Sequence, residues 1–289
     1  MIRIVLLGRC GNNLFQYACG RVLAERHGVP LVMDASWFTP ADWGEVSHLR
    51  RLPLKAEVVR RCSPGARALR RLAGIHYWEL RGVPMLREAE GDMSFDPRFL
   101  AAPADCLLFG YFQTPRYFAG IEPQLREELR TDGLGLEAGH EDLAERMREP
   151  GSVAVHVRRG DYGGNPTLDV CGMDYYDDAM ARLGQAVRAP RFFVFSDDPG
   201  WCKSRFQGPD ITCVPNIPGQ SPLVDLHLMS LANHHVIANS SYSWWAAWLG
   251  KKPGQRVLMP PRWFQGIHAP IAEKQCEGWE IVTGKEPQS

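Results

Sequence analysis

Two adjacent arginines, Arg158 and Arg159, follow an apolar segment that begins at Ser152 and has the composition of a buried strand. Neighbouring side chains on a strand point to opposite faces, so the two guanidinium groups cannot both be surface decoration. We expect one arginine to pair with Asp161 and brace the loop, while the other reaches into a crevice. The planar guanidinium fork suits phosphate oxygens, so the pattern predicts an anion site, with a purely structural arginine–aspartate pair as the alternative.

A second apolar segment, residues 192–195, ends in Ser196, Asp197 and Asp198. Paired carboxylates at such a place could hold a metal ion, or accept hydrogen bonds from a purine base or a ribose. Asp198 could instead cap a helix that begins near Pro199, and this is the interpretation that we favour for that residue.

Small polar side chains also stand at the predicted start of a helix, where Asn239, Ser240 and Ser241 follow another apolar segment. Backbone N–H groups and hydroxyls at a helix N-terminus can bind an anion. Tryptophans at positions 244, 245 and 248 continue this helix at helical spacing, and we interpret them as core side chains rather than as a stacking platform.

The N-terminal turn, residues 8–13, follows a short apolar run and opens a predicted helix over residues 14–27. It is not a dinucleotide-binding fingerprint, because Asn13 stands where the third glycine would be. Asn12 adds a polar amide where a nicotinamide enzyme would use bare backbone, which makes an oxidoreductase a poor interpretation.

Apolar segments and helical patterns alternate along the second half of the chain, which predicts a doubly wound parallel sheet with ligands at the carboxyl ends of its strands. The expected strands are residues 152–157, 191–195, 211–214, 235–238 and 256–259. The expected helices are residues 174–188, 199–206, 222–233 and 241–250. Weak periodicity over residues 133–151 suggests a boundary there, which gives lobes over residues 1–148 and 149–289.

Composition limits the class of protein. The 289 residues are 45% hydrophobic and 23% charged, with 33 basic and 33 acidic side chains, which excludes disordered and collagen-like proteins and disfavours a nucleic-acid binder. The apolar run near the N-terminus is too short for a membrane span or a secretory signal. Eight scattered cysteines without a CxxC pair indicate free thiols, so we expect a cytoplasmic enzyme.

Residues 50–71 form a local basic stretch with a single acidic residue, Glu57. Its basic residues are Arg50, Arg51, Lys55, Arg60, Arg61, Arg67, Arg70 and Arg71. Two solvated helices would explain this pattern. The alternative is a cationic face that docks on anionic lipid head groups or a phosphorylated acceptor, which would place the protein peripherally at the inner face of the membrane.

Taken together, the motifs resemble the α-1,2-fucosyltransferases of glycosyltransferase family 11. The family's opening matches residues 11–18, its double-arginine loop residues 156–162, its Phe-Ser-Asp-Asp strand end residues 195–198 and its Asn-Ser-Ser helix start residues 238–245. Shorter matches occur in the same order at residues 110–113, 174–176 and 225–230. The sequence departs from the family at Arg9 and Cys10, at Asn13, and at Leu168, where many members carry histidine.

The resemblance implies a GT-B-like α/β fold, with two Rossmann-type lobes that face a central cleft. The N-terminal lobe would be the acceptor side, and the C-terminal lobe would bind the GDP-sugar donor. The implied reaction moves L-fucose from GDP-β-L-fucose to the 2-hydroxyl of a galactoside, with inversion and with no metal or other cofactor. The acceptor glycan could be lipid-linked. A transferase for another GDP-sugar or 6-deoxyhexose, or a catalytically silent GDP-sugar-binding module, is the alternative.

The resemblance also assigns roles to the site residues. Arg159 is expected to contact the β-phosphate and, with Arg158 and Asp161, to form the catalytic set. The other residues expected to bind the donor are Gly11, Asn12, His156, Ser196, Asp197, Asp198, Asp225, Asn239, Ser240 and Ser241. Among these, His156 and the two adjacent aspartates would contact the guanine or the ribose. No side chain stands out as the base that accepts the proton of the acceptor hydroxyl.

Overall fold

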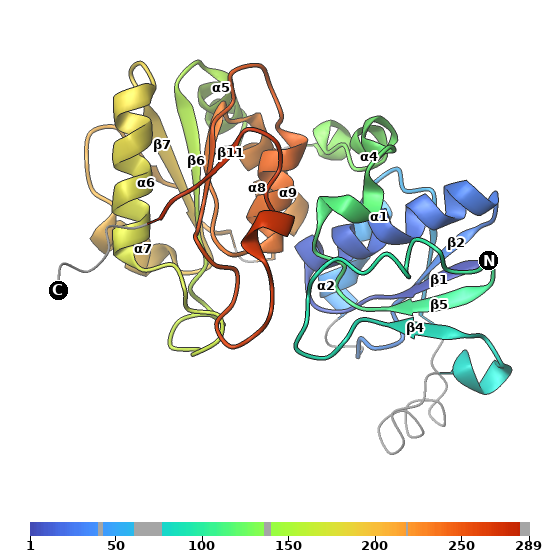
Figure 1. Ribbon diagram of the computed structural model, residues 1–289. Helices are drawn as coiled ribbons and strands as arrows, with labels where there is room; N and C mark the ends of the chain where they lie inside the picture. The colour runs from blue at the N-terminus through green and yellow to red at the C-terminus, as the bar shows by residue number, and fades with distance from the viewer. Residues whose placement is uncertain (40–42, 61–76, 136–139, 218, 284–289) are drawn as a thin grey trace. The chain divides into compact units, whose positions relative to one another are not determined.

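The computed structural model describes residues 1–39, 43–60, 77–135, 140–217 and 219–283 (Figure 1). The chain forms two compact units, Met1–Arg130 and Thr131–Ser289. The division therefore lies earlier in the chain than the expected boundary between residues 148 and 149. The reason is helix α5 (His140–Arg148), which packs against strand β6 (Ser152–Val157) and helix α8 (Pro222–Leu231) and so belongs to the second unit.

The first unit contains a five-stranded parallel sheet in the order β3-β2-β1-β5-β4. Its strands are β1 (Ile2–Val5), β2 (Leu31–Asp34), β3 (Glu57–Val59), β4 (Met85–Arg87) and β5 (Cys106–Phe109). Its helical segments are α1 (Cys10–His27), α2 (Gly44–Ser47), η2 (His48–Arg51), η3 (Glu79–Arg81), η4 (Pro115–Phe118) and α4 (Glu122–Glu128). Helix α1 ends at Gly28, whose left-handed conformation (φ 61°) lets its N–H bond the carbonyls of Ala24 and Glu25.

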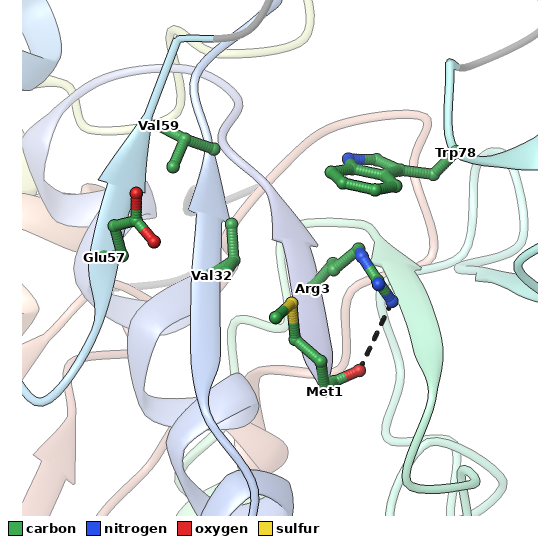
Figure 2. Close-up of a pocket in the computed structure, with 6 residues that line it drawn as sticks. All are labelled: Met1, Arg3, Val32, Glu57, Val59 and Trp78. Atoms are coloured by element: carbon green, nitrogen blue, oxygen red, sulfur yellow. Dashed lines mark hydrogen bonds between the residues drawn. The ribbon is translucent and has the colours of Figure 1, made fainter. Parts of the chain in front are cut away.

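A small cavity of about 100 Å³ lies in this first unit beside β1, β2 and β3 (Figure 2). Its lining residues are Met1, Arg3, Val32, Glu57, Val59 and Trp78. The Arg3 guanidinium stacks 4.4 Å from the Trp78 ring and pairs with Asp105 at 2.6 Å. Arg3 lies opposite Val32, the second residue of β2. The cavity therefore extends toward the amino ends of these strands, away from the carboxyl edge where ligands of parallel sheets bind.

The second unit contains a six-stranded parallel sheet in the order β11-β10-β9-β6-β7-β8. Besides β6, its strands are β7 (Arg191–Ser196), β8 (Ile211–Cys213), β9 (His234–Val236), β10 (Val257–Met259) and β11 (Trp279–Ile281). Besides α5 and α8, its helical segments are η5 (Asp132–Leu134), α6 (Met173–Ala186), α7 (Pro199–Arg205), α9 (Ser241–Leu249) and η6 (Ile271–Glu273). Numbered within the unit, this order is the 3-2-1-4-5-6 arrangement of dinucleotide-binding domains, whose switch point lies between β6 and β9.

The five strands and four helices expected in this half are confirmed, with ends that move by at most two residues. Strand β11 is an addition that the sequence did not predict. In the first unit, the helical segment after Pro115 divides into η4 and α4, because Gly120 adopts a left-handed conformation (φ 98°) between them.

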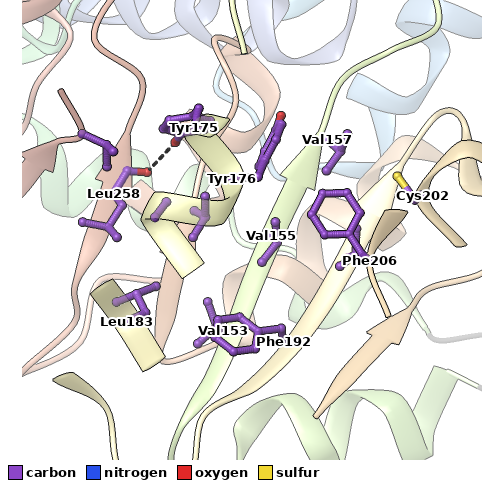
Figure 3. Close-up of a cluster of buried hydrophobic side chains, with 14 residues drawn as sticks. Val153, Val155, Val157, Tyr175, Tyr176, Leu183, Phe192, Cys202, Phe206 and Leu258 are labelled. Carbon is purple, nitrogen blue, oxygen red and sulfur yellow. Dashed lines mark hydrogen bonds between the residues drawn. The ribbon is translucent and has the colours of Figure 1, made fainter. Parts of the chain in front are cut away.

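One face of the second sheet is covered by α6 and α7 (Figures 1 and 3). Val153, Val155 and Val157 alternate along β6 toward this face and pack with Tyr176 of α6. The tryptophans at positions 244, 245 and 248 are buried, as expected for core side chains, and the Trp244 indole donates to the Lys274 carbonyl at 2.7 Å.

Candidate functional site

The loop after β6 holds Arg158 between two carboxylates. Its guanidinium pairs with Asp161 at 2.6 Å and with Asp197 at 2.9 Å, and it stacks 5.4 Å from the Tyr162 ring. Arg158 is therefore the arginine that braces the loop through Asp161. Because the Asp161 side chain is 46% exposed, an incoming anion can compete with it for the Arg158 guanidinium. The Asp197 side chain is only 23% exposed.

Arg159 has different surroundings. Its guanidinium stacks 4.6 Å from the Trp201 ring, and its nearest carboxylate is that of Asp169, at 3.7 Å. Its Nε is buried and has no hydrogen-bond partner among the described residues. Trp201 packs against the cluster that covers the α6 and α7 face of the sheet, so Arg159 continues the side of β6 on which Val157 lies.

Asp197, which follows β7, accepts hydrogen bonds from this loop through both of its carboxylate oxygens. Its Oδ1 accepts from the backbone N–H of Arg159 at 2.8 Å and its Oδ2 from that of Gly160 at 3.1 Å. Burial by itself would raise the pKa of Asp197, but the Arg158 guanidinium and these two N–H groups together lower it below its ordinary value. The side chain thus fixes the arginine loop, and the loop in turn favours its ionised form.

The two neighbours of Asp197 support the end of β7. Asp198 caps α7 by accepting from the Trp201 N–H at 3.0 Å, which was the interpretation favoured from the sequence. The Ser196 hydroxyl accepts from the Asp198 N–H at 3.0 Å.

The start of α9 lies at the carboxyl end of β9. Ser240 caps the helix by accepting from the Tyr242 N–H at 3.4 Å. The Asn239 side chain is buried and donates to the carbonyls of Leu168 and Trp263, both at 2.9 Å. Asn239 therefore positions the loop that follows the arginines. The Ser240 cap starts α9 shortly after β9, so the first turn of α9 lies at the switch point.

His156 connects β6 with α9. Its ring lies 5.6 Å from that of Tyr242, in the first turn of α9, and its Nδ1 is buried without a partner among the described residues. Burial, with a smaller contribution from the Arg158 charge, lowers the pKa of His156 to about 3, so the imidazole is neutral at physiological pH. His156 points to the face opposite Val157, which places the start of α9 on its side of the sheet.

Asp225, in the first turn of α8, belongs to a polar cluster that sequence patterns did not reveal in full. Its carboxylate accepts from Gln220 Nε2 at 2.9 Å, and His140 interacts with it electrostatically. Burial raises the pKa of Asp225 to about 6, against the opposing effects of His140 and Gln220. The Tyr242 hydroxyl donates to the Pro222 carbonyl, which ties the starts of α9 and α8 together at one edge. Gln220 stands five residues from Asp225, but no sequence signal connects His140 with it.

Gly11 and Asn12 belong to the first unit, whereas all other predicted donor-binding residues belong to the second. Asn12 accepts from Gln113 Nε2 at 2.8 Å. Gly8, whose φ is 67°, must be glycine, because a Cβ there would lie 2.2 Å from Asn12 Nδ2.

Neither a cluster of potential metal ligands nor a candidate membrane span occurs in the described part of the chain. No three His, Cys, Asp or Glu side chains gather there to hold a metal ion, and no helix there is long and apolar enough to cross a membrane. The seven cysteines in that part are free thiols.

The basic stretch is described only as far as Arg60; Arg61, Arg67, Arg70 and Arg71 lie outside the described residues. Its described part holds η2 and β3, and the guanidinium groups of Arg50 and Arg60 each stack 5.2 Å from the Trp43 ring.

Two parallel α/β units, the second with its polar residues at the switch point, define a GT-B-like fold. A solved structure of similar fold is the NodZ α-1,6-fucosyltransferase soaked with GDP-fucose, with a TM-score of 0.50, 16% identity and coverage of 86% of this chain and 92% of that one. The model of glycosyl transferase family 11 matches residues 93–266. The chain belongs to glycosyl transferase family 11.

Two relatives show how the sequence similarity is distributed. An α-1,2-colitosyltransferase of Escherichia coli is 38% identical over 164 residues, which are 54% of this chain and 55% of that protein. A galactoside 2-α-L-fucosyltransferase of Bos taurus, SEC1, is 34% identical over 254 residues, or 84% of this chain and 62% of that protein. The match thus spans about half the length of the bacterial relative.

Proposed function

We propose that the protein is an inverting glycosyltransferase that moves L-fucose from GDP-β-L-fucose to the 2-hydroxyl of a galactoside. The observation that carries this proposal is the arginine loop after β6, which shares the switch point of the second sheet with the capped start of α9. Guanidinium groups and helix N-terminal N–H groups are both donors for a diphosphate. Membership of glycosyl transferase family 11 supports the same class of reaction.

The two arginines differ in how they meet a diphosphate bound at α9. Arg158 lies near His156, on the side of β6 that faces the start of α9, whereas Arg159 lies against Trp201. We therefore assign the β-phosphate contact to Arg158, with the diphosphate replacing the exposed Asp161 carboxylate. Arg159, the contact expected from the sequence, is the second candidate.

This arrangement suits sugar transfer with inversion. The acceptor 2-hydroxyl oxygen forms a bond to the anomeric carbon as the bond from that carbon to the phosphate oxygen breaks, and GDP leaves with the electron pair. A fixed guanidinium beside the leaving oxygen stabilises the charge that grows there in the transition state. The hydroxyl proton passes to the leaving phosphate or to water.

We assign the guanine base of the donor to a site formed by Asp225 and His156. The ionised Asp225 carboxylate can accept from the N1–H and the 2-amino group of guanine, which uracil does not offer. The neutral His156 has one ring nitrogen that donates and one that accepts. Asn239 acts indirectly, by positioning the loop between the arginines and α6.

Thermal melts test the donor class. GDP and GDP-fucose at a hundred times Kd should stabilise the protein by about 2.7 kcal/mol and raise Tm by several degrees. UDP and NAD should leave Tm unchanged. A melt that responds to UDP and not to GDP would refute the proposal.

Activity assays separate the alternatives. Release of GDP on incubation with donor and a galactoside distinguishes a transferase from a silent binding module, and linkage analysis identifies the product. Because one relative is named a colitosyltransferase, the donor panel includes GDP-colitose beside GDP-fucose.

Paired variants assign the phosphate contact. Arg158→Ala should lower turnover by about 10²–10³-fold, the usual cost of one preorganised donor, and Arg158→Lys should restore it in part. Arg159→Ala is the matched variant. If it loses more than Arg158→Ala while folding is intact, Arg159 is the contact instead.

A further inference from the structure

Aromatic side chains gather at the carboxyl edge of the first unit's sheet. Phe109 ends β5, Tyr111 follows it by two residues, and Trp37 lies three residues beyond β2. The Trp37 and Phe109 rings meet edge to face, with centroids 5.4 Å apart, across the end of the intervening strand β1. We name Trp37, Phe109 and Tyr111 the aromatic platform.

The aromatic platform is partly exposed to solvent, which is unusual for large apolar side chains. Trp37 and Tyr111 are each 37% exposed, and they are two of the five large hydrophobic side chains that are exposed in the described part of the chain. Exposed apolar groups at the carboxyl ends of parallel strands are typical of a ligand site rather than of ordinary surface.

The backbone beneath the aromatic platform is fixed by hydrogen bonds to Glu88. Glu88 accepts from the N–H groups of Tyr111 at 2.5 Å and of Phe112 at 2.9 Å, and Phe112 has a φ of 53°, rare for a non-glycine residue. A Cβ at Gly110 would lie 2.5 Å from Glu88 Oε2, so this close approach needs glycine there. Such a strained, over-determined turn is a feature of functional sites.

Charged groups surround the aromatic rings. The Arg87 guanidinium stacks 4.6 Å from the Phe109 ring, and the Glu88 carboxylate lies beside Tyr111. A sugar ring needs this combination, because it presents a patch of C–H bonds on one face and hydroxyl groups at its rim. Galactose has such a face, formed by the C–H groups at C3, C4 and C5.

We propose that the aromatic platform binds a galactose ring of the acceptor glycan, with its C–H face against Trp37 and its hydroxyls toward the polar rim. This inference rests on the proposed function and adds the acceptor contact to it. Aromatic stacking of this kind contributes up to about tenfold in affinity for each ring. The donor, which we place in the second unit, does not depend on these rings.

Steady-state kinetics with a galactoside acceptor test the inference. Trp37→Ala should raise the KM for the acceptor by about tenfold, with the KM for GDP-fucose and the slow hydrolysis of donor without acceptor unchanged. Trp37→Phe should restore most of the acceptor affinity, and Tyr111→Ala should act in the same direction as Trp37→Ala. Leu80→Ala is the matched control, because Leu80 is the most exposed of these side chains, at 56%, and lies outside the aromatic platform.

Saturation-transfer NMR with the same galactoside gives a readout that does not need turnover. The wild-type protein should saturate the C3, C4 and C5 protons of galactose, and Trp37→Ala should lose this signal. An unchanged acceptor KM and NMR signal in Trp37→Ala, in a protein that still binds GDP, would overturn the aromatic platform alone. Failure to bind GDP would instead overturn the proposed function.

Discussion

Asp225→Asn should change stability and nucleotide affinity in opposite directions. In the folded protein the pKa of Asp225 is about 6, whereas a carboxyl in the unfolded chain has a pKa of about 3.9. The folded state thus binds this proton more tightly, so the free energy of unfolding falls as pH rises from about 4 to about 6 and is level above that. At pH 7.5 the ionised side chain is a cost that asparagine does not carry.

The size of this effect follows from the two pKa values. Their difference corresponds to at most about 3 kcal/mol, and because the side chain keeps partial contact with water we expect about 1 to 2 kcal/mol. For a chain of this size that raises the Tm of Asp225→Asn by about 2 to 8 °C at pH 7.5. At about pH 3.5, below the pKa of Asp225 in both the folded and the unfolded chain, the two melts should nearly coincide.

The affinity for GDP should fall in the same variant, because asparagine lacks the charge that accepts from the guanine edge. Hydrogen bonds to a charged group contribute about 1.5–3 kcal/mol, which corresponds to about ten- to a hundredfold in Kd by calorimetry. IDP, which lacks the 2-amino group, should bind the wild-type protein more weakly than GDP, and this difference should shrink in Asp225→Asn.

Asp210→Asn, in the exposed turn before β8, is the control and should change neither Tm nor Kd. If the Tm of Asp225→Asn at pH 7.5 is no higher than that of the wild-type protein, the argument that burial makes the ionised Asp225 costly is refuted. An unchanged Kd for GDP would remove Asp225 from the base site.

Three further outcomes are expected. Transfer activity should survive excess EDTA, because Asp197 is held by the arginine loop and Asp198 by its helix cap; loss that Mg²⁺ restores would contradict this. Reversing four basic charges within residues 50–71 should weaken sedimentation with anionic vesicles, at about 1 kcal/mol for each charge, whereas equal binding by wild type and variant would leave only a solvated surface. Gly8→Ala should destabilise the protein in urea melts by at least about 1 kcal/mol, because its Cβ would collide with Asn12 at a left-handed φ; a neutral change would show that the turn can relax.

Local signals determined much of the second unit. The run of β-branched and apolar residues at 152–157 is long enough to fix a strand, and β6 has these bounds. Helix α8 begins where Ser221 and Pro222 provide a cap and a first helical residue, and α9 begins after the Ser240 cap. Strands β3, β4 and β11 were missed, because each is only three residues long and includes a charged side chain, so none of them forms an apolar run; these side chains are Glu57, Arg87 and Glu280.

The sequence by itself also determined the chemistry that the site can offer, because the guanidinium pair, the carboxylates and the hydroxyls at a helix start lie at predicted strand ends. Only the tertiary structure decided which of these groups fix the loop and which lie at the start of α9. The order of the strands sets β7 on one side of β6 and β9 on the other, so Asp197 fixes the loop while His156 meets the start of α9. Which arginine pairs with Asp197, and which stacks on Trp201, depends on partners about 40 residues away in the chain. The contact between Trp37 and Phe109 likewise exists only because β2 and β5 flank β1, and such pairings depend on strand order, which no local pattern encodes.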